Sequence, residues 1–132
     1  MIYALDTSII VDVLSKKKAV TAQFNQVISN RAGIVIPSAV DYEVVRGFYY
    51  NPSLKKEHLY QDMRMNCPVI EVNAAVWRRA AYIWATLRKV GLTIDDADIL
   101  ISATCIERQY TLVTHNTKHF ENINGLLIED WI

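Results

Sequence analysis

Five short apolar runs alternate with longer segments of helical periodicity, and this alternation constrains the fold more than any other feature of the sequence. The runs span residues 2–5, 34–36, 68–72, 111–114 and 127–129. Short, continuous apolar runs are typical of strands that are covered on both faces of a parallel sheet. The segments between them suit helices, and parallel strands joined by helices form layered folds. We therefore predict a three-layer α/β fold, in which helices flank a central, mainly parallel sheet of four to five strands.

Length and composition predict one globular unit. The chain of 132 residues suits a single domain spanning residues 1–132, and its 52% of apolar residues can offset the entropy of ordering it. The 14 basic and 14 acidic side chains cancel, so any affinity for nucleic acid must be local. Cys67 and Cys105 lack metal-ligand spacing, and we expect both to be buried, reduced thiols. Because no signal-peptide pattern or membrane-length apolar run is present, we expect a cytoplasmic protein without membrane segments.

Capping residues predict where the helices begin and end. The predicted caps are Thr7 or Ser8, Ser38 paired with Asp41, Asn73, and Thr93 paired with Asp96. In the two pairs, the spacing of a capping box would satisfy free backbone donors, which gives Asp41 and Asp96 a structural role. The clearest helix covers residues 74–90, where Trp77 and Trp84 recur at helical spacing and are predicted to pack in the core, and Gly91 ends it.

Three carboxylates are less easily explained by local structure. Asp6 ends the first apolar run, where it is either a helix cap or a buried carboxylate that needs donors, a cation or a proton. Glu43 lies beside the apolar face of its helix, and an ion pair with Arg46 three residues later is the competing role. Asp98 leads directly into the apolar residues 99–101, which must belong to the core. Capping and the helix dipole account for the neighbouring Asp95 and Asp96 better than for Asp98.

Carboxylates at the C-terminal edge of a parallel sheet suit a hard divalent cation. We therefore expect Asp6, Glu43 and Asp98 to bind Mg²⁺, with Mn²⁺ as a possible substitute. Zinc is disfavoured because no cysteine joins the acids, and the histidines offer no suitably spaced pair with them; His115 and His119 are expected to be exposed. One or two such ions can activate water and neutralise the transition state of phosphodiester hydrolysis.

Four stretches of the sequence together resemble the PIN-domain ribonucleases, and within them the VapC-type toxins of type II toxin–antitoxin pairs. The stretches cover residues 5–9, 43–47, 96–103 and 112–116, the last followed by 119–120. Each alone is a weak match, but their order and spacing are specific. The resemblance runs nearly from end to end and implies a PIN-like fold.

The resemblance implies a metal-dependent endoribonuclease with Asp6 and Asp98 as metal ligands and Glu43 acting directly or through metal-bound water. Asp96 would add charge to the pocket. Asn116, which stands where many relatives have aspartate, is expected to orient water, phosphate or a carboxylate together with Thr7, Ser8 and Thr114. The resemblance also implies a cognate VapB-like antitoxin, a homodimer, and an RNA substrate that is single-stranded or a loop, with tRNA as one candidate.

Surface residues suggest how RNA is held, and two other functions remain open. Arg46, on the same helix as Glu43, is the best candidate for contacting RNA phosphate. Tyr49 and Tyr50 could stack on bases, anchor the antitoxin or pack. The alternatives to a nuclease are a catalytically inactive PIN-fold binding module and, with less support, a phosphoacceptor signalling domain. The latter would carry its acceptor aspartate after the third strand, where Asn73 stands instead.

Overall fold

The computed structural model describes residues 1–132, and its strands form one five-stranded sheet. The strands are β1 (Ile2–Leu5), β2 (Gly33–Pro37), β3 (Val69–Ile70), β4 (Thr111–Val113) and β5 (Leu127–Glu129). They are arranged in the order β3-β2-β1-β4-β5, and every neighbouring pair is parallel. The structure thus confirms the predicted α/β class and the five apolar runs as its strands.

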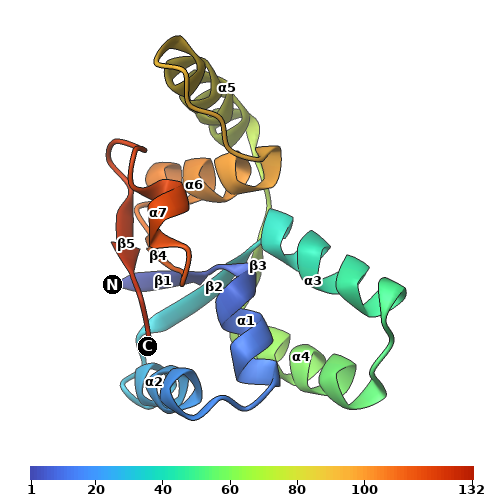
Figure 1. Cartoon of the computed structure of the whole chain (residues 1–132). Helices are drawn as coiled ribbons and strands as arrows, with labels where there is room; N and C mark the ends of the chain where they lie inside the picture. Colours follow the sequence, from blue (N-terminus) through green and yellow to red (C-terminus); the bar gives the residue numbers. More distant parts are fainter.

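Seven helices connect the strands and cover the sheet on both faces. They are α1 (Thr7–Leu14), α2 (Lys18–Ser29), α3 (Ser38–Tyr50), α4 (Leu54–Asn66), α5 (Ala74–Lys89), α6 (Asp96–Arg108) and α7 (Thr117–Phe120). Parallel strands are joined by right-handed crossovers, so connections that run in opposite directions along the sheet lie on opposite faces. Figure 1 shows α1, α2 and α4 on one side of the sheet and α5 and α6 on the other. This is the predicted three-layer arrangement.

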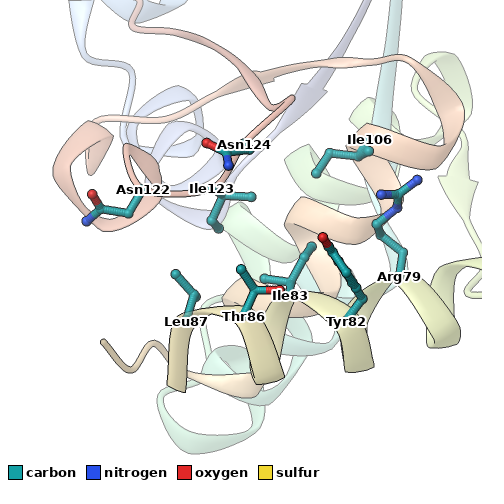
Figure 2. A pocket seen from close by; sticks show the side chains of 9 residues that line it. All are labelled: Arg79, Tyr82, Ile83, Thr86, Leu87, Ile106, Asn122, Ile123 and Asn124. Carbon is teal, nitrogen blue, oxygen red and sulfur yellow. The ribbon is translucent and has the colours of Figure 1, made fainter. Parts of the chain in front are cut away.

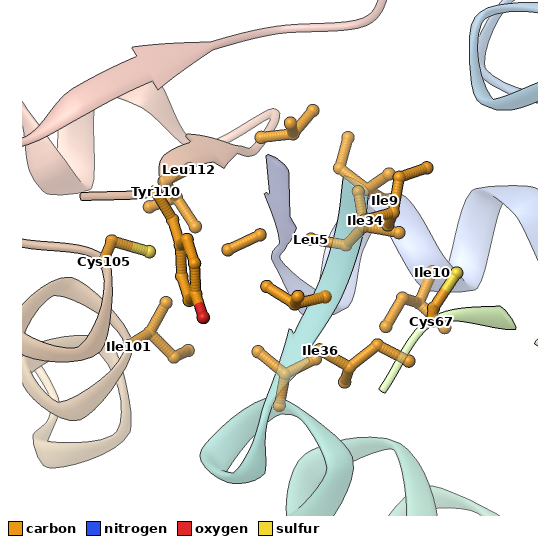
Figure 3. Packing of buried hydrophobic residues seen from close by; sticks show 14 of the residues in the cluster. Leu5, Ile9, Ile10, Ile34, Ile36, Cys67, Ile101, Cys105, Tyr110 and Leu112 are labelled. Carbon is orange, nitrogen blue, oxygen red and sulfur yellow. The ribbon is translucent and has the colours of Figure 1, made fainter. Parts of the chain in front are cut away.

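The core lies on both faces of the sheet and holds the two cysteines. Figure 3 shows Ile101 and Cys105 of α6 on one side of the strands, and Ile9 and Ile10 of α1 on the other. These four side chains are almost completely buried. Burial raises the pKa of the other thiol, Cys67, to about 11, so it stays protonated at neutral pH. Both cysteines are free and buried, as predicted.

The ends of α5 follow the sequence pattern. Asn73 caps the helix, because its side-chain oxygen accepts a hydrogen bond from the Val76 N–H at 3.0 Å. Gly91 follows the last turn with φ +76°, a left-handed conformation that favours glycine. The Leu92 N–H then donates to the Leu87 carbonyl at 2.9 Å and closes the helix. Both predicted boundaries are therefore confirmed.

The two predicted capping boxes are wrong. Ser38 is already the first residue of α3, so its hydroxyl cannot occupy the capping position, which Pro37 fills. Asp41 instead accepts a 2.7 Å hydrogen bond from the Tyr60 hydroxyl and ties α3 to α4. The helix expected from Thr93 begins three residues later, at Asp96, which follows a capping residue without a side-chain hydrogen bond.

The tryptophans of α5 face solvent and not the core, which corrects the prediction from helical spacing. Trp77 is 58% exposed and Trp84 is 45% exposed. The buried stripe of this helix consists of Val76, Ala80, Ile83 and Leu87. Each tryptophan directly follows a buried residue, Val76 or Ile83, and therefore points about 100° away from it.

Candidate active site

The carboxyl ends of β1 and β4 form a natural binding position in this sheet. These two strands are neighbours, yet the chain leaves β1 towards β2 and leaves β4 towards β5, in opposite directions along the sheet. Ligands of open α/β sheets gather at such a switch point. Asp6 directly follows β1 and Thr114 directly follows β4, and the Asp6 N–H donates to the Val113 carbonyl at 2.9 Å.

Asp6 is buried at this point and is held by two hydrogen bonds. Only 4% of its surface is exposed. One carboxylate oxygen accepts from the Thr7 N–H at 2.8 Å, and the other accepts from the hydroxyl of the fully buried Thr114 at 2.7 Å. Asp6 therefore caps α1 itself, where Thr7 or Ser8 was expected to do so. The two bonds offset the cost of burying the carboxylate and fix its position.

Glu43 is joined to Asp6 through Thr7. The Thr7 hydroxyl donates to Glu43 Oε1 at 2.7 Å, while the backbone N–H of the same residue donates to Asp6. The predicted contact with Arg46 is present, but it is long at 3.5 Å and lies at the surface. The tertiary contact with Thr7 is thus the shorter one and brings α3 to the end of β1.

Asp98 is the third acid of the group. It lies on α6, on the face of the sheet opposite to the face that α1 covers. Its carboxylate accepts no hydrogen bond within the chain, and the Nδ1 of the exposed His119 lies 3.7 Å away. Burial first, and then the negative charges of Asp6 and Glu43, raise the pKa of Asp98 to about 6. The structure therefore places all three predicted acids within electrostatic reach of one another.

The donor set can be compared with the needs of a divalent cation. Carboxylate oxygens from three separate elements are the ligands that Mg²⁺ and Mn²⁺ prefer. The mutual repulsion at Asp98 is the kind that a bound cation relieves. However, the acids do not converge on one point in a preformed coordination shell. The type and charge of the donors fit such an ion, and Asp6, Glu43 and Asp98 are the residues that would hold it.

The supporting residues lie at different distances from the acids. Thr7 and Thr114 contact them directly, whereas Asp96 is exposed and bonds to neither Asp6 nor Glu43. The exposed Asn116 takes part through its backbone, because its N–H donates to the Thr114 hydroxyl at 3.0 Å. Asp95, assigned to capping from the sequence, makes no side-chain cap and adds negative charge near Asp98.

Two histidines near the site are placed differently from the prediction. His119 is exposed as expected, but it lies beside Asp98, a neighbour that its position in the sequence did not reveal. His115 is partly buried, with Nε2 2.7 Å from Asp12 and Nδ1 2.7 Å from Asp130. It thereby ties the segment after β4 to α1 and to the C-terminal segment. His115 follows Thr114 directly, so these contacts also support the position of the Thr114 hydroxyl.

The small cavity between α5 and residues 122–124 is separate from the acids. Figure 2 shows Tyr82, Ile83 and Leu87 of α5 opposite Ile123. Its volume is only about 70 Å³, and none of the three acids lines it. The three acids therefore lie at the C-terminal ends of the strands and not in this cavity.

Comparison with known proteins shows the family of this chain. Residues 3–126 match the family model described as PIN domain. Ribonuclease VapC2 of Rickettsia felis is 30% identical over 134 residues, which cover 99% of this chain and 98% of that protein. The tRNA(fMet)-specific endonuclease VapC of Shigella flexneri is 27% identical and covers 98% of this chain and 97% of its own length.

Solved structures give the same result. The crystal structure of VapBC2 from Rickettsia felis, bound to a DNA fragment from the promoter, contains a chain with a TM-score of 0.88 and 29% identity, and each chain is covered to 100%. VapBC-1 from nontypeable Haemophilus influenzae matches with a TM-score of 0.86 and 25% identity, over 99% of this chain and 98% of that one. The chain therefore belongs to the PIN-domain family and, within it, to the VapC ribonucleases. None of its helices has the length and apolar character that a membrane crossing requires.

Proposed function

We propose that this chain is an endoribonuclease that depends on Mg²⁺, or Mn²⁺ in its place, bound by Asp6, Glu43 and Asp98. The observation that carries the proposal is the state of Asp98, which accepts no hydrogen bond and faces the charges of two further carboxylates. A structural carboxylate would normally be paired or bonded. A carboxylate beside two others that accepts no hydrogen bond and has only a 3.7 Å contact with an exposed histidine is typical of a functional site.

The residues of the chain have distinct roles in this proposal. A bound divalent ion would supply an activated water and charge stabilisation for phosphodiester cleavage. Thr7 and Thr114 hold Asp6 in place, and Thr7 also holds Glu43. Arg46 lies beside Glu43 with an exposed guanidinium, where it can contact the RNA phosphate backbone.

Removal of the metal is expected to abolish RNA cleavage. Purified protein should cut RNA in Mg²⁺ or Mn²⁺ and lose this activity in excess chelator. Mg²⁺ should also stabilise the wild type by about 2.7 kcal/mol at 100 times its Kd, because it binds the folded state. This effect, measured by thermal unfolding, should be much smaller for Asp98→Asn, which lacks one ligand charge. Undiminished cleavage in chelator would contradict the metal dependence.

We also propose that the chain acts as a toxin restrained by a VapB-like antitoxin. The similar solved structures from Rickettsia felis and Haemophilus influenzae are VapBC complexes, which supports this role. The name of the Shigella flexneri relative supports tRNA as the substrate class. The homodimer and the cytoplasmic location implied by the sequence stay predictions.

The toxin role has a direct test in cells. Induction of the wild-type chain should arrest growth, and co-expression of the cognate antitoxin should restore it. The Asp98→Asn variant, at an equal protein level, should not arrest growth, because the variant loses a catalytic charge and keeps the fold. Arrest by the variant would show that toxicity does not come from cleavage.

The two alternative functions gain no support. Similarity to VapC ribonucleases covers nearly the whole chain, and all three principal acids are brought together. A binding module has no need for a partly buried carboxylate, such as that of Asp98, that accepts no hydrogen bond. In a phosphoacceptor domain the acceptor would follow β3, where Asn73 serves as a helix cap.

A further inference from the structure

A large hollow is lined by residues of α3, α5 and α6, and two of these helices, α3 and α6, also carry Glu43 and Asp98. It has a volume of about 500 Å³ and is bounded by α3, the segment after β3, and the first turns of α5 and α6. We call it the Tyr42–Trp77 pocket, after the two aromatic residues in its lining; Glu71, Asp96, Ala97 and Leu100 also contribute. None of the three acids lines this pocket, but Arg46 connects it to the active site, because its guanidinium lies over the Tyr42 ring and 3.5 Å from Glu43.

The aromatic side chains of this pocket are open to a ligand. Tyr42 is 60% exposed, and Trp77 is similarly exposed and lies outside the core. The Arg46 guanidinium lies over the Tyr42 ring, 5.1 Å from its centroid, and covers one face of it. Flat, exposed rings next to a site that cuts RNA are surfaces on which bases stack.

The charges at the pocket limit what can enter it. Glu71 and Asp96 are exposed, and neither forms a hydrogen bond or an ion pair within the chain. Two free carboxylates repel a phosphate but accept hydrogen bonds from N–H groups. The ligand that suits this combination is flat and uncharged and carries an amino group, as cytosine does at N4. Uracil has an acceptor oxygen at the corresponding position and fits less well.

We propose that the Tyr42–Trp77 pocket binds an unpaired nucleobase next to the scissile phosphate and prefers a base with an amino group. The base lies against the exposed rings, and its amino group points to Glu71 or Asp96. This inference rests on the proposed ribonuclease function and adds a specificity site to it. It also gives Asp96 a role in base selection, separate from metal binding.

Binding can be measured without cleavage in the full-length Asp98→Asn protein. The probes are short, labelled oligo(C) and oligo(U), which differ in the group at position 4 of the base. We expect oligo(C) to bind about tenfold more tightly than oligo(U), since a hydrogen bond to a charged acceptor has about this effect. Adding Trp77→Ala should weaken oligo(C) binding roughly 5- to 150-fold, as expected for the loss of base stacking.

Two further variants make the result specific. Trp84→Ala removes another exposed tryptophan of the same helix outside the pocket, and it should change the affinity by less than about twofold. Glu71→Gln combined with Asp96→Asn should bring the ratio of oligo(C) to oligo(U) affinity close to one. The ratio is the readout, because removing negative charge also raises affinity for any RNA.

Several outcomes separate this proposal from others. Equal effects of Trp77→Ala and Trp84→Ala on binding would overturn it. A change in oligomeric state with Trp77→Ala, without a change in RNA binding, would also overturn it and assign the pocket to a protein interface. If the wild type cuts no RNA in Mg²⁺, the proposed function fails, while the binding comparison still decides whether the pocket holds a base.

Discussion

Asp98→Asn is expected to lower kcat/KM for RNA cleavage by at least about 100-fold while the protein remains folded, as for loss of one preorganised electrostatic group in other enzymes. The amide keeps the size of the side chain but removes the charge. A labelled oligoribonucleotide in Mg²⁺ gives the rate. Asp62→Asn is the matched control, because Asp62 is exposed on α4 and makes no hydrogen bond or ion pair. If the variant's rate stays within a few-fold of the wild-type rate, Asp98 does not take part in catalysis.

The same substitution is expected to stabilise the fold at neutral pH. The pKa of Asp98 is about 6 in the folded chain, against 3.8 for an ordinary aspartate, so the folded state holds the proton more tightly. The resulting penalty is absent below about pH 4, grows as pH rises to about 6, and is complete above it. At pH 7 the asparagine variant should gain about 1 kcal/mol, after allowing for screening by water.

Urea unfolding at several pH values measures this gain. The difference in free energy of unfolding between the variant and the wild type should grow as pH rises from about 4 to 6 and then level off. A constant difference across this range would show that the charge of Asp98 is not the cause. The change in stability would then come from a feature of Asp98 other than its charge.

Asp6→Ala is expected to destabilise the fold, in contrast to Asp98→Asn, and to lower RNA cleavage as strongly as Asp98→Asn does. The substitution leaves the Thr7 N–H without its cap and the buried Thr114 hydroxyl without its acceptor. The lost cap costs about 1 kcal/mol, and the buried Thr114 O–H donor, left without an acceptor, costs about 1 to 3 kcal/mol more, although the hydroxyl oxygen still accepts from the Asn116 N–H. We therefore expect the free energy of unfolding to fall by roughly 2 to 4 kcal/mol, with loss of cleavage from the missing carboxylate.

A double variant isolates the buried hydroxyl. Thr114→Val removes the O–H donor that lacks an acceptor and nearly preserves the shape of the side chain, but it also removes the acceptor of the Asn116 N–H at the surface. Asp6→Ala with Thr114→Val should therefore recover only part of the lost stability, without restoring cleavage. Urea unfolding and the oligoribonucleotide assay provide the two readouts. If Asp6→Ala alone costs less than about 0.5 kcal/mol, Asp6 does not hold the ends of β1 and β4 together.

Much of this protein follows from local patterns in its sequence. Burial on both faces makes each strand of a parallel sheet a short apolar run, so the strands could be located before the fold was known. The alternation with helices then implied the parallel sheet, and its C-terminal edge implied where Asp6 would lie. Glu43 and Asp98 were identified because neither had a sufficient local explanation, together with the resemblance to PIN domains.

Only the tertiary structure decided which partner each polar side chain has. Thr114 and Asp6 are 108 residues apart in the sequence, yet their hydrogen bond orders the centre of the site. Asp41 had a plausible local role as a cap, but a buried phenol from another helix provides a short hydrogen bond instead. The raised pKa of Asp98 likewise depends on burial and on the charges of Asp6, which follows β1, and of Glu43 on α3. Helical spacing identifies a stripe only to within a residue, which is why Trp77 was predicted in the core. Periodicity records which residues are buried, whereas hydrogen bonds and charges act between segments that only the folded chain brings together.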